Sequence, residues 1–425
     1  MHILSMKEKT KAISIKAIPD ADVFHVPLLQ HIGKPAEPVV QAGDEVKQYQ
    51  LIGKAAKGLS ANIHSPVSGT VLDIKTITLA NGASIPAVII KNDHKDQVQL
   101  PLEGESSTAK SVVEIIKDAG IVGEGGAQFP TDIKYSVGDQ KIDTLIINGT
   151  ECEPYLTADY ALMSRFTEEL LKGINIVNSV LKAGQIVLTM EEQNKELEEK
   201  FAPFLSQDSY KNIRIKILPD TYPQGGELQL IKSVTGIELP KKKLPKDAGV
   251  IVSNVGTIYA VYQAVEKHRP VISRFITVSG EESKNYGNYE VKIGTPLSHI
   301  LKTLDISAGD ATVVLGGPMM GKSVSDINVP ITKGSSGLLF LKKKDEYREH
   351  CISCGYCIEV CPMHLMPLKF NEIFRTGKYE KLEKYGLNNC IECAACAYIC
   401  PSNVPLIESI KKGKTKLKEL TNAVK

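Results

Sequence analysis

The sequence of 425 residues has little net charge and no long apolar run. Lys and Arg total 51 against 49 for Asp and Glu, so no strong electrostatic field favours nucleic acid as a partner. No apolar run approaches the ~20 residues that a membrane-spanning helix needs. Residues 1–9 also lack the uninterrupted apolar core of a signal peptide. We therefore expect a cytoplasmic protein whose link to a membrane, if it has one, comes through a partner.

Cysteine is scarce outside two short runs, which hold all but Cys152 of the nine cysteines. Both runs, at residues 351–362 and 390–401, read CxxCxxCxxxCP. This spacing is typical of two-cluster ferredoxins, in which the fourth cysteine of one run binds the cluster of the other. Zinc fits eight cysteines in two matched runs poorly, and disulfides would need an oxidising compartment. We assign one [4Fe–4S] cluster to Cys351, Cys354, Cys357 and Cys400, and a second to Cys390, Cys393, Cys396 and Cys361.

Residues 24–75 alternate short apolar runs with Gly and Asp turns, a pattern that predicts a small all-β sandwich. It looks like the hybrid barrel of biotinyl and lipoyl carriers. The corresponding hairpin here reads Lys57-Gly58-Leu59-Ser60 and lacks the flanking residues of a carrier lysine. We expect a docking or scaffold role for this unit.

An α/β pattern follows a polar linker at 95–107 and a helix at 108–119. Strands are expected at 144–148, 185–189, 213–218 and 249–253. The glycine-rich stretch at 120–131 follows a helix rather than a strand, so it is not the Rossmann fingerprint. It fits either a ligand loop, whose backbone N–H groups approach an anion or a flat ring, or a plain turn.

Three further loops are polar or rich in glycine, at residues 148–155, 222–227 and 254–257. Ligands of open α/β sheets bind beyond the carboxyl ends of strands, so we expect these loops to share a crevice. Helix N-termini there would favour a phosphate. Residues 271–320 form another small unit, with strands near 275–280 and 290–293 and a helix near 297–304.

These motifs occur in a fixed order: residues 30–36 (Gln-His-Ile-Gly-Lys-Pro-Ala), 123–131, 148–155, 222–227, 316–321 and the double cysteine run. The series resembles RnfC-like proteins, the C subunit of the Rnf-type ferredoxin–NAD oxidoreductase, over nearly the whole chain. That family is related to the FMN- and NADH-binding subunit of respiratory complex I. The resemblance implies a multidomain α/β and α+β chain: a barrel-sandwich hybrid (1–100), a Rossmann-like α/β FMN/NADH domain (108–268), a β-grasp (SLBB-type) unit (271–340) and a helical 2[4Fe–4S] ferredoxin domain (346–425).

The resemblance also implies cofactors, partners and site residues. NADH would give two electrons as a hydride to FMN, and each cluster would accept one; no protein acid–base residue is expected to be essential. The expected partners are other subunits of a membrane-bound Rnf-type complex, on the cytoplasmic face, with ferredoxin reached indirectly. The residues expected to hold FMN are Gly123, Gly125, Gly126, Ala127, Phe129, Thr131, Asn148, Glu151, Glu153, Gly225, Gly226, Glu227 and Asn254.

Three residues in the 148–155 loop and two departures from the family pattern have expected effects of their own. Glu151 and Glu153 are expected to bond the flavin or to repel misplaced anions, and Cys152 to be a buried structural thiol. The chain departs from the family pattern at Gln128, where Gly is usual, and at Leu228, where Lys is usual. Two alternatives stay open: a soluble RnfC-like protein that feeds another reductase, of proline or cobalamin type, and an iron–sulfur adaptor that binds no flavin.

Overall fold

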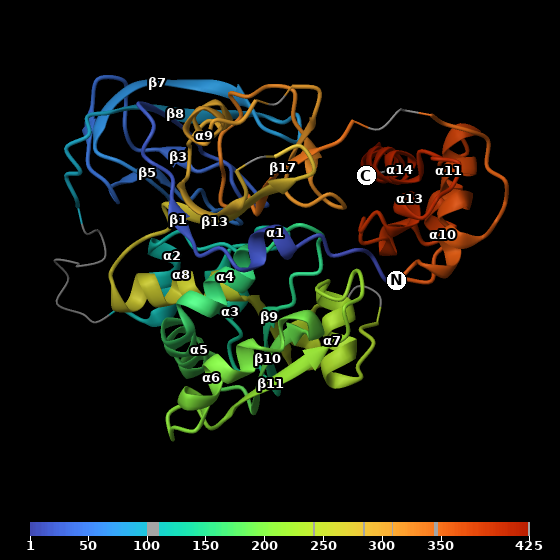
Figure 1. The fold of residues 1–425 in the computed structure, drawn as a ribbon, viewed down its shortest axis with the longest axis horizontal. Coiled ribbons are helices and arrows are strands. Elements are labelled where there is room, and N and C mark those ends of the chain that lie inside the picture. Colours follow the sequence, from blue (N-terminus) through green and yellow to red (C-terminus); the bar gives the residue numbers. More distant parts are fainter. Residues whose placement is uncertain (100–109, 241–242, 284, 308, 344–346, 424–425) are drawn as a thin grey trace.

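The computed structural model describes residues 1–99, 110–240, 243–283, 285–307, 309–343 and 347–423. A β-rich barrel and a mixed β-sheet lie above an α/β domain, and a small helical domain lies at one end (Figure 1). The predicted linker from residue 100 on, the start of the predicted helix at 108–109, and the predicted domain boundaries at 100 and 346 fall outside the described residues.

The barrel consists of two small sheets, with strand orders β2-β8-β7-β4 and β3-β5-β6. Phe24, Ile52 and Ile90 are fully buried between them, because alternate residues of each strand face inward. The predicted all-β sandwich is confirmed, and Lys57 is exposed on its hairpin. The strands are β2 (Val23–Pro27), β3 (Glu37–Pro38), β4 (Glu45–Val46), β5 (Leu51–Lys54), β6 (Ile63–His64), β7 (Gly69–Thr78) and β8 (Ser84–Asn92).

The α/β domain has a parallel sheet in the order β11-β10-β9-β12, close to the four predicted strands. Its strands are β9 (Thr144–Gly149), β10 (Gln185–Glu191), β11 (Ile213–Leu218) and β12 (Val250–Asn254). Its helices are α2 (Val112–Asp118), α3 (Thr131–Tyr135), α4 (Ala158–Arg165), α5 (Thr167–Leu181), η1 (Glu192–Asn194), α6 (Leu197–Leu205), α7 (Glu227–Thr235), η2 (Pro245–Ala248) and α8 (Val255–Glu266). Asn148 and Asn254 are register partners, so β9 and β12 end together.

The mixed sheet has the order β1-β14-β13-β17-β15-β16, with β13 and β17 parallel at its centre. Leu297 and Ile300 of its helix are buried on the sheet, the layering expected of a β-grasp unit. The elements are β13 (Ser273–Gly280), β14 (Gly287–Lys292), α9 (Leu297–Thr303), β15 (Thr312–Leu315), β16 (Lys322–Ser323) and β17 (Gly337–Leu341).

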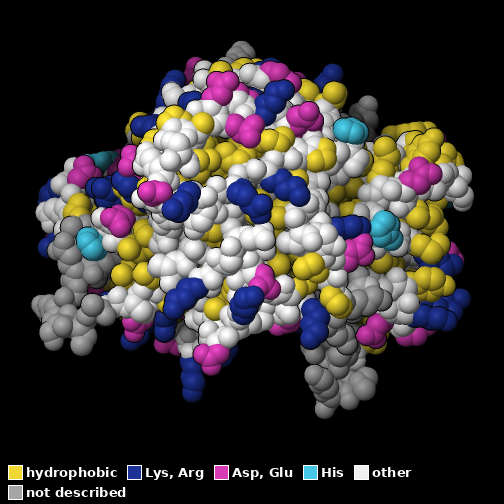
Figure 2. All heavy atoms as spheres, turned by 90° about the horizontal axis from the view of Figure 1, so that it is seen from below, with side chains coloured by type: hydrophobic (Ala, Val, Ile, Leu, Met, Phe, Trp, Pro, Cys, Tyr) yellow, Lys and Arg dark blue, Asp and Glu magenta, His cyan; other side chains and the backbone are white. Residues whose placement is uncertain are grey.

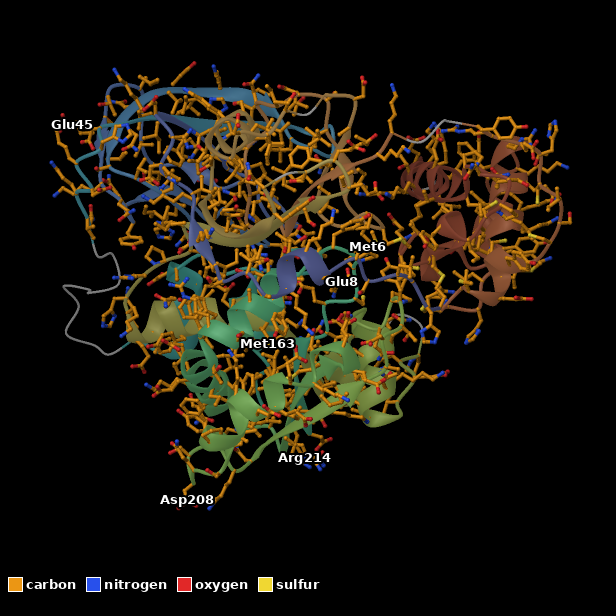
Figure 3. All side chains as sticks on the ribbon, viewed as in Figure 1. Met6, Glu8, Glu45, Met163, Asp208 and Arg214 are labelled. Carbon is orange, nitrogen blue, oxygen red and sulfur yellow. The ribbon has the colours of Figure 1, made fainter. Side chains whose placement is uncertain are left out.

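The first residues of the chain precede the barrel and pack on the neighbouring units. Strand β1 (Lys16–Ala17) pairs with β14, and α1 (Glu8–Lys11) lies between the mixed sheet and the α/β domain. Figure 3 labels Met6 and Glu8 on this crossing, whereas Glu45, Asp208 and Arg214 lie at outer edges of the molecule. The N-terminal segment therefore runs past the α/β domain towards the helical domain.

The helical domain is built from two halves that each carry one cysteine run. Its elements are α10 (Tyr356–Glu359), α11 (Pro367–Arg375), α12 (Lys381–Lys384), η3 (Leu387–Asn389), α13 (Ala395–Tyr398) and α14 (Leu406–Ala423). Phe370, Leu382 and Ile410 fill its core. Across the described ranges, no helix combines the length and the apolar character needed to cross a membrane.

Candidate functional site

Two cavities in the helical domain are each lined by four cysteines, three from one run and one from the other. Cys351, Cys354, Cys357 and Cys400 line one cavity, and Cys361, Cys390, Cys393 and Cys396 line the second. These are the two sets that the crossed assignment names. The ligand sets themselves stay a prediction, and this grouping of thiols is what they require.

The two runs share a backbone conformation that turns N–H groups towards sulfur. Ser353 and Glu392 occupy matching positions, and both have φ of 57°. Their N–H groups donate to the sulfurs of Cys351 and Cys390, each over 3.4 Å. Hydrogen bonds to sulfur help to set the potential of an iron–sulfur cluster, so the fold itself would tune both sites.

The two cavities differ in depth. Cys351 and Cys354 are exposed, whereas Cys393 and Cys396 are buried. Burial raises the pKa of Cys396 to about 12, so this thiol is neutral in the absence of metal and must lose its proton when iron binds. The cavity at Cys351 thus faces solvent, and the cavity at Cys393 lies inward.

The inner cavity is joined to the α/β domain through Tyr222. The Tyr222 hydroxyl donates to the Cys393 carbonyl oxygen over 2.6 Å, and its ring packs beside Cys393 and Ala395. The backbone of Tyr222 also exchanges two hydrogen bonds with Met1, of 2.9 and 2.8 Å. The N-terminus, a loop of the α/β domain and one cluster cavity therefore form a continuous contact.

The glycine loop at 120–131 is closed at its base and exposed at its tip. The N–H groups of Gly123 and Thr131 donate to Phe129 and Ile121, over 2.8 and 3.0 Å. Gly125, Gly126 and Ala127 are exposed at the tip. Gly125 has φ of 75°, and a side chain there would approach Asn254 Nδ2 to 3.1 Å. The tip thus lies against the end of β12 with its backbone accessible.

The loops that follow β9 and precede α7 also meet. Asn148 Nδ2 donates to the Gly225 carbonyl oxygen over 3.0 Å, and the Gly225 N–H donates to the Cys152 sulfur over 3.3 Å. A Cβ on Gly225 would lie 2.3 Å from the Thr150 carbonyl oxygen, so only glycine allows this approach. With Asn254 beside Asn148, the structure brings the predicted loops together at one edge of the sheet.

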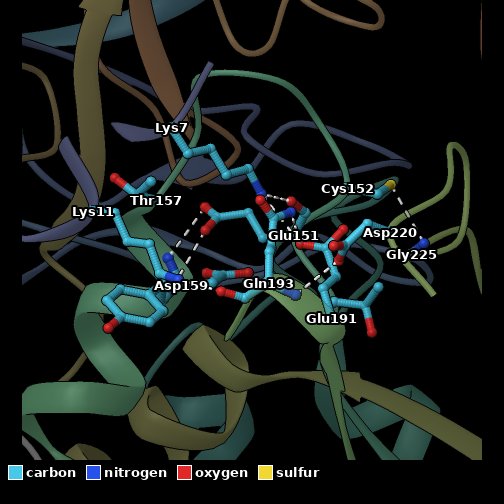
Figure 4. Close-up of polar contacts among 12 residues, drawn as sticks. Lys7, Lys11, Glu151, Cys152, Thr157, Asp159, Glu191, Gln193, Asp220 and Gly225 are labelled. Atoms are coloured by element: carbon cyan, nitrogen blue, oxygen red, sulfur yellow. Dashed lines mark hydrogen bonds and ion pairs between the residues drawn. The ribbon is translucent and has the colours of Figure 1, made fainter. Parts of the chain in front are cut away.

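Glu151 caps the N-terminus of α4. Its carboxylate accepts the N–H groups of Asp159 and Tyr160, and Figure 4 shows Glu151 beside Asp159. Asp159 in turn accepts a 2.7 Å hydrogen bond from Asn254 Nδ2. Burial is the largest cause that raises the pKa of Glu151, and the repulsion between the two carboxylates is the second. Burial also raises the pKa of Asp159. The pair therefore holds a proton at pH values above the usual pKa range of carboxyl groups.

Glu153 bonds the mixed-sheet unit. Its carboxylate accepts the N–H groups of Met319 and Met320, over 3.0 and 2.9 Å, and a Cβ on Gly317 would lie 2.3 Å from it. The flavin contacts expected of Glu151 and Glu153 stay a prediction. In the structure both carboxylates have partners within the chain, one on α4 and one on the 316–321 loop.

Sequence reasoning missed several charged residues around this site. Lys7 is buried, and its ammonium donates to Glu191 over 3.2 Å and to the carbonyl oxygen of Glu151. Although burial opposes it, the charges of Glu191 and Glu151 hold the pKa of Lys7 above its ordinary value. Arg274 forms a buried ion pair with Glu124 of the glycine loop. No local pattern marks these residues, since their partners are distant in sequence.

The remaining predicted positions fit a ligand that accepts hydrogen bonds. The hydroxyl of Thr131 is buried and has no hydrogen-bond partner in the described part of the chain. Gly226 and Glu227 begin α7, where Glu227 pairs with Lys134, and Leu228 is half-buried in the first turn. The Thr131 hydroxyl, the N–H groups at the start of α7 and the exposed tip of the glycine loop suit the phosphate and ring of a flavin nucleotide.

Gln128 adopts a backbone conformation that suits glycine. Its φ is 50°, in the left-handed region, and its amide donates to the Gly126 carbonyl oxygen. The same side chain also lies against Gly334 of the mixed-sheet unit. The departure from the family pattern therefore changes a contact between units.

Three family models match separate parts of the chain. Residues 1–95 match an RnfC barrel sandwich hybrid domain, residues 116–263 match a Nuo51 FMN-binding domain, and residues 350–404 match a 4Fe-4S dicluster domain. The predicted fold class and the predicted FMN and [4Fe–4S] cofactors are thereby confirmed.

Curated relatives are similar over nearly the full chain. The C subunit of an ion-translocating oxidoreductase complex of Rhodobacter capsulatus is 39% identical, covering 99% of this chain and 82% of the relative. The C subunit of a proton-translocating ferredoxin:NAD(+) oxidoreductase complex of Clostridium ljungdahlii is 38% identical over 89% of this chain and 84% of its own length. A Na(+)-translocating counterpart of Acetobacterium woodii is 34% identical, with shares of 90% and 88%.

A solved structure has a related fold. The NAD+-reducing [NiFe]-hydrogenase in the H2-reduced state has a chain that matches with a TM-score of 0.50 and 19% identity, covering 74% of this chain and 62% of that one. At this identity the likeness concerns the fold alone.

Proposed function

The chain belongs to the family of C subunits of ion-translocating oxidoreductase complexes, and on that premise we propose that it exchanges electrons between NADH and two [4Fe–4S] clusters through FMN. The relatives named for ferredoxin:NAD(+) oxidoreductase support this assignment. FMN supplies the chemistry that connects a two-electron donor with one-electron acceptors.

The chain's own residues would hold the flavin at the carboxyl edge of the α/β sheet. The N–H groups of the exposed residues Gly125, Gly126 and Ala127 and the hydroxyl of Thr131 would bind its acceptor atoms. Gly123 and Phe129 hold the base of the loop, and Asn148, Gly225 and Asn254 fix the neighbouring loops. Glu151 and Glu153 would then shape the site through α4 and the 316–321 loop.

One observation carries the proposal: Tyr222 connects this edge with the inner cluster cavity. Its hydroxyl lies 2.6 Å from the Cys393 carbonyl oxygen, while Gly225, three residues on, bonds Cys152 and Asn148. We propose that the cluster of Cys361, Cys390, Cys393 and Cys396 is the first to accept electrons from the flavin. The cluster of Cys351, Cys354, Cys357 and Cys400, two of whose thiols are exposed, would pass electrons on.

The expected partners are other subunits of an ion-translocating complex, to which this chain would attach peripherally on the cytoplasmic face of the membrane; ferredoxin would be reached indirectly. Apolar side chains gather over the helical domain at the right of Figure 2. Ile352 and Tyr356, beside the outer cysteines, are 65% and 49% exposed, which favours a protein partner at this cluster.

An anaerobic titration of the purified, cluster-reconstituted protein with FMN, followed by desalting and NADH, tests the assignment. We expect one flavin to stay bound per chain and its visible absorbance to bleach with stoichiometric NADH. Flavin that washes out supports the flavin-free adaptor. Flavin that binds but stays oxidised under excess NADH supports a soluble protein serving another reductase. Either result contradicts the proposed role.

A further inference from the structure

The segment 332–335 (Thr-Lys-Gly-Ser) belongs to the mixed-sheet unit but lies against the glycine loop of the α/β domain. We propose that Lys333 is a positioning residue that holds the glycine loop in its flavin-binding conformation, with Gly334 and Ser335 supporting two further points of the loop. The proposal rests on the function proposed above, because the ligand of the loop is FMN.

Lys333 anchors the start of the loop. Its side chain is buried, and its ammonium donates to the carbonyl oxygen of Gly120 over 2.6 Å and to that of Asn62 over 2.8 Å. Its own N–H donates to Gln30 Oε1 over 2.9 Å. One side chain therefore connects the barrel, the mixed-sheet unit and the first residue of the glycine loop.

The geometry at Gly120 shows how close this contact is. Gly120 has φ of 64°, and a Cβ there would lie 2.2 Å from the Asn62 carbonyl oxygen and 2.9 Å from Lys333 Nζ. A residue with a side chain would have to displace one of these groups. Asn62 also donates to the Asp118 carbonyl oxygen over 3.2 Å, which fixes the end of α2 immediately before the loop.

The next residues of the segment reach further along the loop. The Ser335 carbonyl oxygen accepts a 3.1 Å hydrogen bond from Arg274 Nε, and Arg274 pairs with Glu124. The N–H of Glu124 donates to Thr257 at the start of α8 over 2.9 Å. A Cβ on Gly334 would lie 2.8 Å from the Gln128 side chain, so that side chain rests on Gly334.

The contacts of Lys333 favour a specific role over simple packing. Among the described residues, its ammonium bonds backbone carbonyl oxygens rather than a carboxylate, and burial lowers its pKa to about 7. Placing an ammonium there is costly, and an apolar side chain of similar length would fill the same space without that cost. What an apolar side chain cannot do is hold the Gly120 carbonyl.

Between these anchors, Gly125, Gly126 and Ala127 are exposed with their backbone available. A loop fixed at Gly120, Glu124 and Gln128 does not need to be ordered when its ligand binds, and such preorganisation increases affinity. Losing the first anchor should therefore weaken FMN binding about tenfold, which corresponds to about 1.4 kcal/mol.

The experiment compares Lys333→Met with Lys292→Met in the cluster-reconstituted, full-length protein. Lys292 belongs to the same unit and pairs with Asp20, away from the glycine loop. Two quantities are measured: the Kd for FMN, and the hydrogen exchange of residues 120–128 in the flavin-free protein. We expect Lys333→Met to raise the Kd about tenfold and to speed exchange in that loop, with no such effect of Lys292→Met.

The outcomes separate this inference from the proposed function. Wild-type protein that binds no FMN contradicts the proposed function. Wild-type protein that binds FMN, with an unchanged Kd or unchanged loop exchange in Lys333→Met, overturns the positioning role, as does an equal effect of Lys292→Met. If Lys333→Met does not fold, Glu124→Gln, which alters the second anchor, is measured in the same way. An unchanged Kd for FMN or unchanged loop exchange in Glu124→Gln also overturns the inference.

Discussion

Replacement of Lys7 by methionine should destabilise the junction at the N-terminal segment strongly. The Lys7 ammonium lies 3.2 Å from Glu191, and the two side chains are 4% and 2% exposed. At an effective dielectric constant of ~20 this separation corresponds to an attraction of about 5 kcal/mol, which opposes the cost of desolvating both ions. Removing one ion leaves Glu191 buried and unpaired, a change that costs about 3–5 kcal/mol.

The assay is urea denaturation followed by circular dichroism, on wild type, Lys7→Met, Glu191→Gln and the double variant. We expect the double variant to recover much of the loss, because no uncompensated charge then remains. A loss of stability below about 1 kcal/mol in Lys7→Met would contradict this prediction, since it would mean that water reaches Glu191. A double variant no more stable than Lys7→Met would refute it as well.

Three further predictions concern the site. Tyr222→Phe removes the hydrogen bond to Cys393 and should cost about 1 kcal/mol in stability. We expect stopped-flow absorbance to show slower cluster reduction by NADH, with unchanged FMN affinity. An unchanged rate of cluster reduction would contradict electron transfer from the flavin to the clusters by way of Tyr222. The raised pKa of Glu151 means that the folded state binds its proton more tightly than the unfolded chain does, so stability should fall as pH rises above the usual carboxyl range. Denaturation at a series of pH values should show a flatter profile for Glu151→Gln, and equal slopes would argue against the shift. Cys361→Ser should damage the cluster of the Cys390 run rather than its own, as measured by EPR and iron content; the reverse result would reject the crossed assignment.

The features that could be predicted from the sequence are those that depend on the spacing of nearby residues. The cysteine runs repeat one pattern, and the structure gathers their thiols into two sets of four. Strand β11 coincides with its predicted range of 213–218, because isoleucine alternates there with Arg and Lys, the pattern of a half-buried strand. Loops that follow parallel strands meet at one edge by the geometry of the sheet, so the meeting of Asn148 and Asn254 was also predictable.

The contacts between units could not be predicted in this way. Lys7 reaches Glu191, and Lys333 reaches Gly120, across separations that no periodic pattern records. The carboxylates of Glu151 and Glu153 stand in a motif that suggests ligand contacts, yet their observed partners are α4 and the 316–321 loop. Such partners depend on how the units pack, which is decided by tertiary structure rather than by local propensity.

EPR of the NADH-treated protein, with and without FMN, tests directly whether electrons pass from NADH to the clusters through FMN. We expect reduced [4Fe–4S] signals when FMN is bound and none when flavin has been removed, with the signals restored on adding FMN back. Clusters that NADH reduces equally well without flavin would contradict the proposed electron route through FMN. Clusters that stay oxidised although bound flavin is bleached would contradict it too.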